Sequence, residues 1–260
     1  MTETTLDTPA SEEKPRRLRF DWLLGVIIKP RATFEQIVHE AGSVWLTPLL
    51  GLMVMALVRV FVAGGIRMAM GGMAELPPDY QYWSPDQQSQ YMQTAAMMSG
   101  PIFVFVFPAI TAVLSLWVGW LIVGGLLNLS LALFGGRSSS GSIMNLAAWA
   151  LLPFGVRDLI QVIYMIFTNQ PVSGAGLSGF APLDAGQLTI IMVVVLGLID
   201  LYLIWHAVLL KVGVSASGGL SQGRAWASVL AVVFASLIGQ AVLGFIGAQL
   251  SNLTVGGFFF

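Results

Sequence analysis

Five long apolar stretches constrain the fold of this chain more than any other feature. They cover roughly residues 45–65, 102–134, 146–167, 188–210 and 226–249. Each reaches the ~20 residues that a helix needs to cross about 30 Å of hydrocarbon. Their apolarity is continuous rather than alternating, which favours helices over a barrel, because lipid offers no partner to a loose backbone amide. The sequence therefore predicts an all-α integral membrane bundle of five transmembrane helices.

Composition agrees with a membrane protein and narrows its chemistry. The chain is 56% hydrophobic and only 10% charged, whereas a soluble domain carries about 25% charged residues. It contains no cysteine, which excludes disulfides, thiolate catalysis and cysteine-rich metal sites. We expect a disordered, basic cytoplasmic arm over residues 1–19 and a single membrane domain over residues 20–260.

Basic residues gather on one side of the predicted spans. The nine on that side are Lys14, Arg16, Arg17, Arg19, Lys29, Arg31, Arg137, Lys211 and Arg224. The opposite side has only Arg67. Cytoplasmic loops are rich in lysine and arginine, so this bias predicts a cytoplasmic N-terminus and, with five spans, an external C-terminus.

Two segments outside the spans have recognisable local patterns. After Pro30, an apolar face formed by Phe34, Ile37 and Val38 at helical spacing predicts an N-terminal amphipathic helix on the inner leaflet. The basic residues Lys14, Arg16, Arg17, Arg19, Lys29 and Arg31 form a cluster suited to anionic lipid. On the other side, Ser84-Pro85-Asp86 predicts a helix start, with Ser84 as the cap.

Four charges lie inside the predicted spans at comparable depth: Arg59, Arg157, Asp158 and Asp200. A lone charge at the bilayer centre costs at least about 2.5–3.5 kcal/mol, so these residues are expected to face inward and pair. Arg157 and Asp158 point about 100° apart on their helix, which favours partners on other spans. Three polar neighbours extend this layer: Gln161, His206 and Gln240.

Two interpretations of this layer stay open. It could form a path for a substrate or a proton, or it could be a hydrogen-bonded network that fixes helix packing. The two positive and two negative charges sum to zero, which favours the packing network.

Other motifs give no catalytic or metal site. Residues 174–179 match a glycine-rich GxGxxG pattern and include Ser178 in a setting similar to a rhomboid-protease serine, but they lie in a polar loop. Methionines in the first outer segment could bind Cu(I), yet they equally suit helix ends and partner grooves. His206 follows Asp200 by six residues and projects from another face. We therefore expect no catalytic residue, no metal, no cofactor and no nucleic-acid partner.

A set of motifs along the chain is similar to those of the YIP family, the Rab-GTPase-interacting five-span membrane proteins, in its prokaryotic type. They are Pro30-Arg31-Ala32-Thr33-Phe34, Trp45–Pro48, Gly135-Gly136-Arg137-Ser138, Ala150 with Pro153, Trp205 with Gly213, and Ser221 with Ala225. The resemblance covers residues 22–250. It implies a partner-binding membrane protein, with some relatives accessory to transport, in a bacterial plasma membrane.

The short cytoplasmic arm lacks the Asp-Leu-Tyr-Gly-Pro-Phe-Trp stretch of eukaryotic members, which argues against a Rab-type GTPase as partner. The predicted function is a non-enzymatic scaffold or accessory subunit that binds another membrane protein or forms a homo-oligomer. The competing prediction is a small transporter or channel that uses the charged layer.

Overall fold

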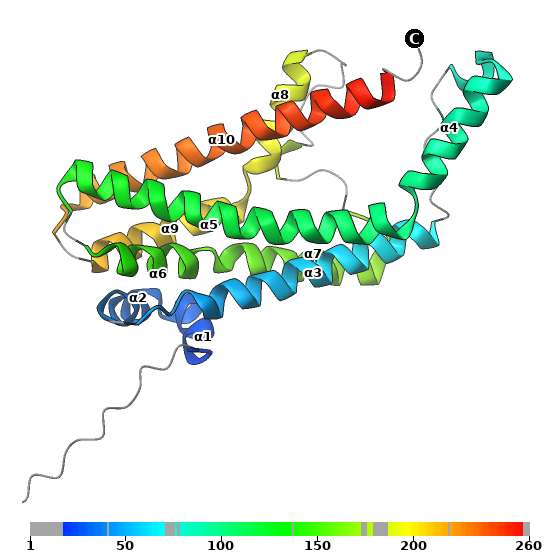
Figure 1. The fold of residues 1–260 in the computed structure, drawn as a ribbon. Coiled ribbons are helices and arrows are strands. Elements are labelled where there is room, and N and C mark those ends of the chain that lie inside the picture. Colours follow the sequence, from blue (N-terminus) through cyan, green and yellow to red (C-terminus); the bar gives the residue numbers. More distant parts are fainter. Residues whose placement is uncertain are drawn as a thin grey trace, which may run out of the picture.

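The structure, a computed structural model, describes residues 18–40, 42–70, 76, 79–136, 138–172, 176–178, 187–217 and 219–256 (Figure 1). Its elements are α1 (Asp21–Ile28), α2 (Pro30–His39), α3 (Leu46–Ala69), the short η1 (Tyr80–Tyr82), α4 (Pro85–Met98), the π-helical η2 (Ile102–Val106), α5 (Phe107–Phe134), α6 (Ser140–Ala150), α7 (Leu152–Thr168), α8 (Gln187–Leu198), α9 (Leu201–Ala216) and α10 (Gln222–Gly256). Every regular element among the described residues is a helix, which confirms the all-α prediction.

Four helical segments are long and apolar enough to cross a membrane: Leu46–Ala69, Ile102–Phe134, Ser140–Thr168 and Gln222–Ile246. A fifth crossing forms if α8 and α9, which meet at a bend of 54°, count as one span. In Figure 1 α3, α5, α7 and α9 run side by side, while α8 turns away from their common direction. The membrane bundle is confirmed, but the third and fourth spans are interrupted rather than continuous.

The break in the third span follows from Pro153, which has no backbone N–H to donate. The Phe154 amide bonds the Leu151 carbonyl at 3.0 Å, three residues back instead of four. This tighter turn leaves the Ala150 carbonyl without its helical donor. The carbonyl must find another partner inside the protein.

The break in the fourth span follows from Asp200, whose backbone is extended and whose side chain accepts from the Leu203 amide at 2.7 Å. An aspartate in this role starts a new helix rather than continuing an old one. On the other side of the break, the Leu177 amide donates to the carbonyls of Leu196 and Ile199 at 2.9 and 3.1 Å. The Leu177 amide, which precedes α8 in the chain, therefore supplies one donor that two carbonyls of the interrupted backbone share.

The buried core lies at the end of the bundle that holds α1 and α2. Its fully buried large side chains include Trp149, Phe34, Leu127, Leu146 and Leu210. They come from four different helices: Trp149 and Leu146 from α6, and one each from α2, α5 and α9. The two N-terminal helices therefore belong to the packed core of the bundle.

The helix expected after Pro30 is present as α2, with Pro30 at its first position. However, Phe34 and Ile37 are completely buried, and α2 packs on α6 and α9. Its apolar face therefore meets protein, and the predicted contact of this face with the inner leaflet is not confirmed. The helix is bounded by Lys29 and Glu40.

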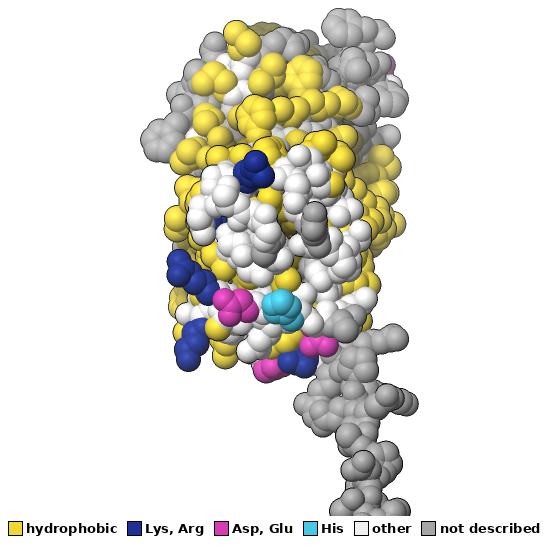
Figure 2. Space-filling view, turned by 90° about the vertical axis from the view of Figure 1, so that its left-hand side faces the viewer, with side chains coloured by type: hydrophobic (Ala, Val, Ile, Leu, Met, Phe, Trp, Pro, Cys, Tyr) yellow, Lys and Arg dark blue, Asp and Glu magenta, His cyan; other side chains and the backbone are white. Residues whose placement is uncertain are grey.

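The ends of the bundle differ in character. The helix start at Ser84 is as predicted: Ser84 accepts from the Gln87 amide, and the Gln87 side chain bonds back in a capping box. That helix, α4, stands across the direction of the spans at the far end (Figure 1). The opposite end, seen in Figure 2, gathers basic, acidic and histidine side chains on one face. Residues 1–17, with Lys14, Arg16 and Arg17, lie outside the described residues.

Candidate functional site

The four charges predicted to share a layer lie together in the structure and link three elements. Arg59 of α3 places its Nε 3.3 Å from Asp158 Oδ1 on α7. Arg157, the neighbour of Asp158, places its Nε 3.7 Å from the same oxygen. Arg157 Nη1 also donates to Asp200 Oδ2 at 3.3 Å, at the break between α8 and α9. A chain of alternating charge thus runs from α3 through α7 to the broken span.

Asp158 lies at the centre of this chain and is the most enclosed of the four, with 9% of its side chain exposed. Three buried atoms meet there, Arg59 Nε, Arg157 Nε and Asp158 Oδ1, and none of them forms a hydrogen bond. Their attraction therefore rests on charge at short distance rather than on hydrogen-bond geometry. Removing one partner would leave the others uncompensated in a medium of low dielectric.

Asp200 serves two partners with its two oxygens. Oδ2 accepts from Arg157, and Oδ1 accepts from the Leu203 amide. The carboxylate is thus the cap of α9 and a counter-ion of α7 at once. Because the α9 N-terminus also favours negative charge, the same residue type suits both contacts.

Arg59 differs from its partners in being half-exposed. Its side chain is 38% exposed, and it lies about 20 Å along α3 from Leu46 at 1.5 Å per residue. Within the described part of the chain its only polar partner is Asp158. The side chain is thus only partly covered by the bundle, at a depth where lipid offers few hydrogen-bond acceptors.

The three predicted polar neighbours do not join this chain of charges. His206 is buried, and its Nδ1 lies 2.7 Å from the Ala150 carbonyl left free at the break in the third span. Gln240 is exposed on α10 and donates to the Ser236 carbonyl of its own helix at 3.3 Å. Gln161 has no hydrogen bond among the described residues. These residues were grouped because their positions along the spans predict a similar depth in the membrane. Within the described part of the chain, they form no hydrogen bond with the four charged residues.

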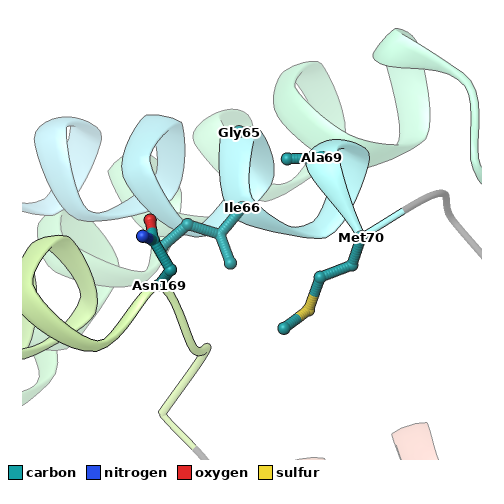
Figure 3. A pocket seen from close by; sticks show the side chains of 5 residues that line it. All are labelled: Gly65, Ile66, Ala69, Met70 and Asn169. Carbon is teal, nitrogen blue, oxygen red and sulfur yellow. The ribbon is translucent and has the colours of Figure 1, made fainter.

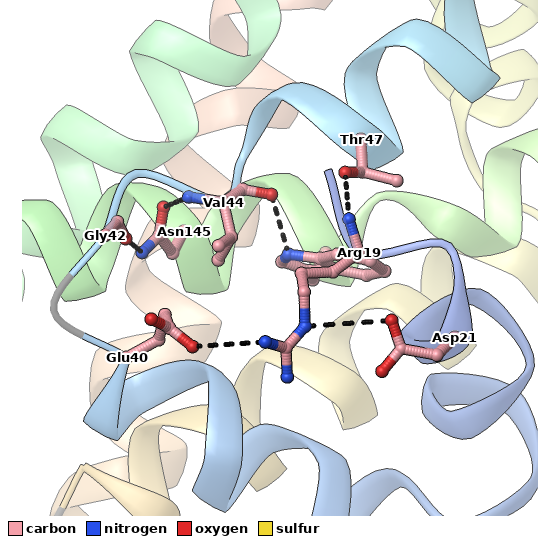
Figure 4. A network of polar contacts seen from close by, with 8 residues as sticks. Arg19, Asp21, Glu40, Gly42, Val44, Thr47 and Asn145 are labelled. Carbon is pink, nitrogen blue, oxygen red and sulfur yellow. Dashed lines mark hydrogen bonds and ion pairs between the residues drawn. The ribbon is translucent and has the colours of Figure 1, made fainter. Parts of the chain in front are cut away.

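A second polar network, which the sequence did not indicate, joins the N-terminal segment to α6 (Figure 4). The buried Asn145 accepts from the Val44 amide at 3.0 Å and donates to the Gly42 carbonyl at 2.9 Å. The Trp149 indole donates to the Val44 carbonyl at 3.2 Å. These bonds satisfy the backbone just before α3. Trp149 is completely buried.

Arg19 extends this network at its edge. Its guanidinium lies 3.7 Å from Asp21 and 3.8 Å from Glu40, and it stacks over the Trp22 ring at 4.1 Å. Its backbone amide donates to Thr47 Oγ1 at 2.9 Å in the first turn of α3. The start of α1 is thereby fixed at the level where the first span begins.

The far end of α3 borders a pocket of about 420 Å³ lined by Gly65, Ile66, Ala69, Met70 and Asn169. Figure 3 shows these side chains around an open space, with Met70 and Asn169 on opposite sides. No charged residue lines it. Among the described residues there is also no cluster of three or more histidine, aspartate or glutamate side chains that could hold a metal ion. Neither feature supplies a reactive group.

Comparison with known proteins agrees with this architecture. A family model described as the Yip1 domain matches residues 24–244. The chain is similar to membrane protein YknW of Bacillus subtilis (strain 168), with 27% identity over 252 residues that cover 91% of this chain and 93% of that protein. No solved structure matches.

Proposed function

The chain belongs to the Yip1 family of integral membrane proteins, and from that premise we propose that it is a non-enzymatic accessory subunit that binds another membrane protein. The observation that supports this proposal is the Arg59 side chain in the middle of α3, which is 38% exposed although it is charged. A lone arginine at the centre of a membrane-spanning helix costs about 2.5–3.5 kcal/mol, and the ion pair with Asp158 engages only one side of the Arg59 guanidinium. A partner helix that offers acceptors to Arg59 would remove that cost.

Other features of the bundle agree with a binding role. The inner charges are occupied with one another, because Asp158 pairs with two arginines and Asp200 caps α9. On α10, the exposed small residues Ala231, Ala235 and Gly239 lie next to the exposed amide of Gln240. Small residues let helices approach closely, and a polar side chain beside them adds a hydrogen bond across the contact.

Placement in the membrane is part of the same proposal. We place the chain in a bacterial plasma membrane, with the end that holds α1 and α2 on the cytoplasmic side and the C-terminus outside. The described basic residues Arg19, Lys29, Arg31, Lys211 and Arg224 near this end support that orientation, since cytoplasmic loops are rich in such residues.

Site-directed photo-crosslinking tests the binding role. A photoreactive residue at Val58, exposed beside Arg59 on α3, is compared in cells with one at Val118, exposed on α5. We expect one protein adduct of defined mass from position 58, lost when Arg59→Gln is added, and only lipid adducts from position 118. Lipid adducts alone at both positions would contradict the proposal.

A transporter or channel is the second candidate, and the bend at Asp200 favours it. Half-helices that end inside a span line the binding sites of many transporters. A path through the charged layer would need water at Gln161, one turn from Arg157 on α7. The chain has no native cysteine, so a single Gln161→Cys variant in intact cells is a clean probe. Reaction with a membrane-impermeant thiol reagent would support a path, and an inert thiol would argue against it.

A further inference from the structure

The two N-terminal helices bury similar inner faces but expose opposite outer ones. α1 buries Trp22 and Val26, and α2 buries Phe34 and Ile37, all in the same core. On the outside, α1 exposes apolar side chains, with Phe20, just before it, 64% exposed, Leu24 67% and Ile28 69%. Such a row of large apolar side chains is not expected to face water.

The outer face of α2 is polar instead. Its exposed residues are Arg31, Ala32, Glu35, Gln36 and His39. Two successive helices on one core thus face two different environments, an apolar one at α1 and an aqueous one at α2. The outward apolar face thus belongs to α1, and the outward face of the helix predicted to be amphipathic, α2, is polar.

The level of α1 along the bundle fits an apolar environment. The Arg19 amide donates to Thr47 Oγ1 in the first turn of α3, so α1 starts where the first span starts. In Figure 1 α1 runs across the direction of α3, and α2 is seen nearly end-on. A helix that lies across the spans at the point of their entry lies in the plane of the membrane interface.

Two basic side chains follow the apolar face directly. Lys29 and Arg31 are exposed at the end of α1 and the start of α2, and neither forms an ion pair within the described residues. Arg19, by contrast, is held by Asp21, Glu40 and Trp22. Lys29 and Arg31 are therefore free to meet anionic headgroups beside the embedded face.

We propose that α1 is an in-plane membrane anchor, with Phe20, Leu24, Ile27 and Ile28 in the acyl-chain region and Lys29 with Arg31 bound to the headgroups of acidic phospholipids. Long basic side chains next to apolar ones can keep their stems in lipid and their charges at the phosphate level. The proposal does not depend on the accessory-subunit role, because the lipid contact forms whether or not a protein partner is present.

Depth-dependent quenching tests the anchor. Single cysteines replace Leu24, Ile28 or, as a control on the outer face of α2, Gln36, and each carries the same environment-sensitive fluorophore. The full chain is placed in nanodiscs made with brominated lipid and exposed in parallel to iodide in the buffer. We expect bromine to quench positions 24 and 28 and iodide to quench position 36. Iodide quenching at 24 and 28, or shielding from both quenchers by a protein copy, would overturn the proposal.

Lipid selectivity tests the basic pair. Native mass spectrometry from mixed micelles measures how strongly the protein retains phosphatidylglycerol over phosphatidylcholine. We compare the full chain with the variant Lys29→Gln/Arg31→Gln and with the control Lys211→Gln/Arg224→Gln. Both double variants remove two positive charges from the same end of the molecule. We expect the preference for phosphatidylglycerol to fall roughly fivefold for each basic residue replaced in the first pair, and to fall less in the control. Equal losses, or none, would overturn the assignment to Lys29 and Arg31.

Discussion

Arg157 and Asp200 join the third span to the break in the fourth, with Arg157 Nη1 3.3 Å from Asp200 Oδ2. The other oxygen of the same carboxylate accepts from the Leu203 amide at 2.7 Å. The two contacts depend on different properties of the side chain, since pairing needs the negative charge and capping needs only an acceptor oxygen. Substitution can therefore separate them.

Asp200→Asn keeps an acceptor for Leu203 and removes the charge opposite Arg157. We expect it to lower the free energy of unfolding by about 1.5–3 kcal/mol, the range for a hydrogen bond to a charged group. Asp200→Ala should cost about 1 kcal/mol more, because the cap of α9 is lost as well. Reversible unfolding by SDS in bicelles measures both values. Equal losses for the two variants would mean that the cap contributes nothing.

Asp158 and Arg59 form the pair best suited to a double-mutant cycle. Asp158→Asn should destabilise the protein more than Arg59→Gln, because Asp158 is more enclosed and faces two guanidinium groups. Removing it leaves both arginines without their shared partner. In the same unfolding assay we expect a coupling energy of about 1 kcal/mol or more between the two substitutions. Additivity within about 0.3–0.5 kcal/mol would show that the short distance contributes no net attraction.

His206 and the Ala150 carbonyl form a separate link between α9 and the break in the third span. A carbonyl can only accept, so Nδ1 carries the proton in this contact. His206→Phe keeps the ring but removes the donor, and we expect a loss of about 1–3 kcal/mol in unfolding free energy.

His206→Asn is the matched control, because its amide N–H can reach the position of Nδ1. It should recover part of the stability despite its smaller volume. A phenylalanine variant as stable as the wild type would show that packing of the ring, and not the bond to Ala150, holds the break in place.

The positions of the spans and the grouping of the four charges could be predicted from the sequence, because both follow from simple rules about apolar length and buried charge. A run of about 20 apolar residues must cross the bilayer, and charges at one depth must find one another. The four charged residues lie within such runs and at one depth: Arg59, Arg157, Asp158 and Asp200. Gln240 does not join them, because depth alone says nothing about the face of the helix on which a residue lies.

The breaks and the packing of α2 required the structure. Pro153 and Asp200 each occur in apolar runs that hydropathy treats as continuous, and only the local hydrogen bonds show that each interrupts its helix. The apolar face of α2 has the same spacing whether it meets lipid or protein. What decides between them is Gly213 on α9, which gives Phe34 room to enter.

Gly213 offers a direct test of that packing. A Cβ at this position would lie 2.6 Å from Leu146 Cγ and 3.0 Å from Phe34 Cδ1. We expect Gly213→Ala to destabilise the protein by about 1–3 kcal/mol through overpacking, although alanine is the better helix former by about 1 kcal/mol. Gly125 on α5 is the matched control, because a Cβ there meets nothing within 4 Å. Gly125→Ala should leave stability unchanged or raise it.

These two variants, together with a second substitution at Phe34, test where α2 lies. If both alanines are neutral or stabilising in the SDS assay, Phe34 is not held against Gly213, and α2 is free to lie on the leaflet as its sequence pattern predicts. If only Gly213→Ala destabilises, the added methyl group is held against Leu146, Phe34 or both, and recovery by a change at Phe34 would show that the face of α2 belongs to the protein core. In that case a second substitution, Phe34→Leu, should recover part of the loss, because the smaller side chain leaves space for the added methyl group.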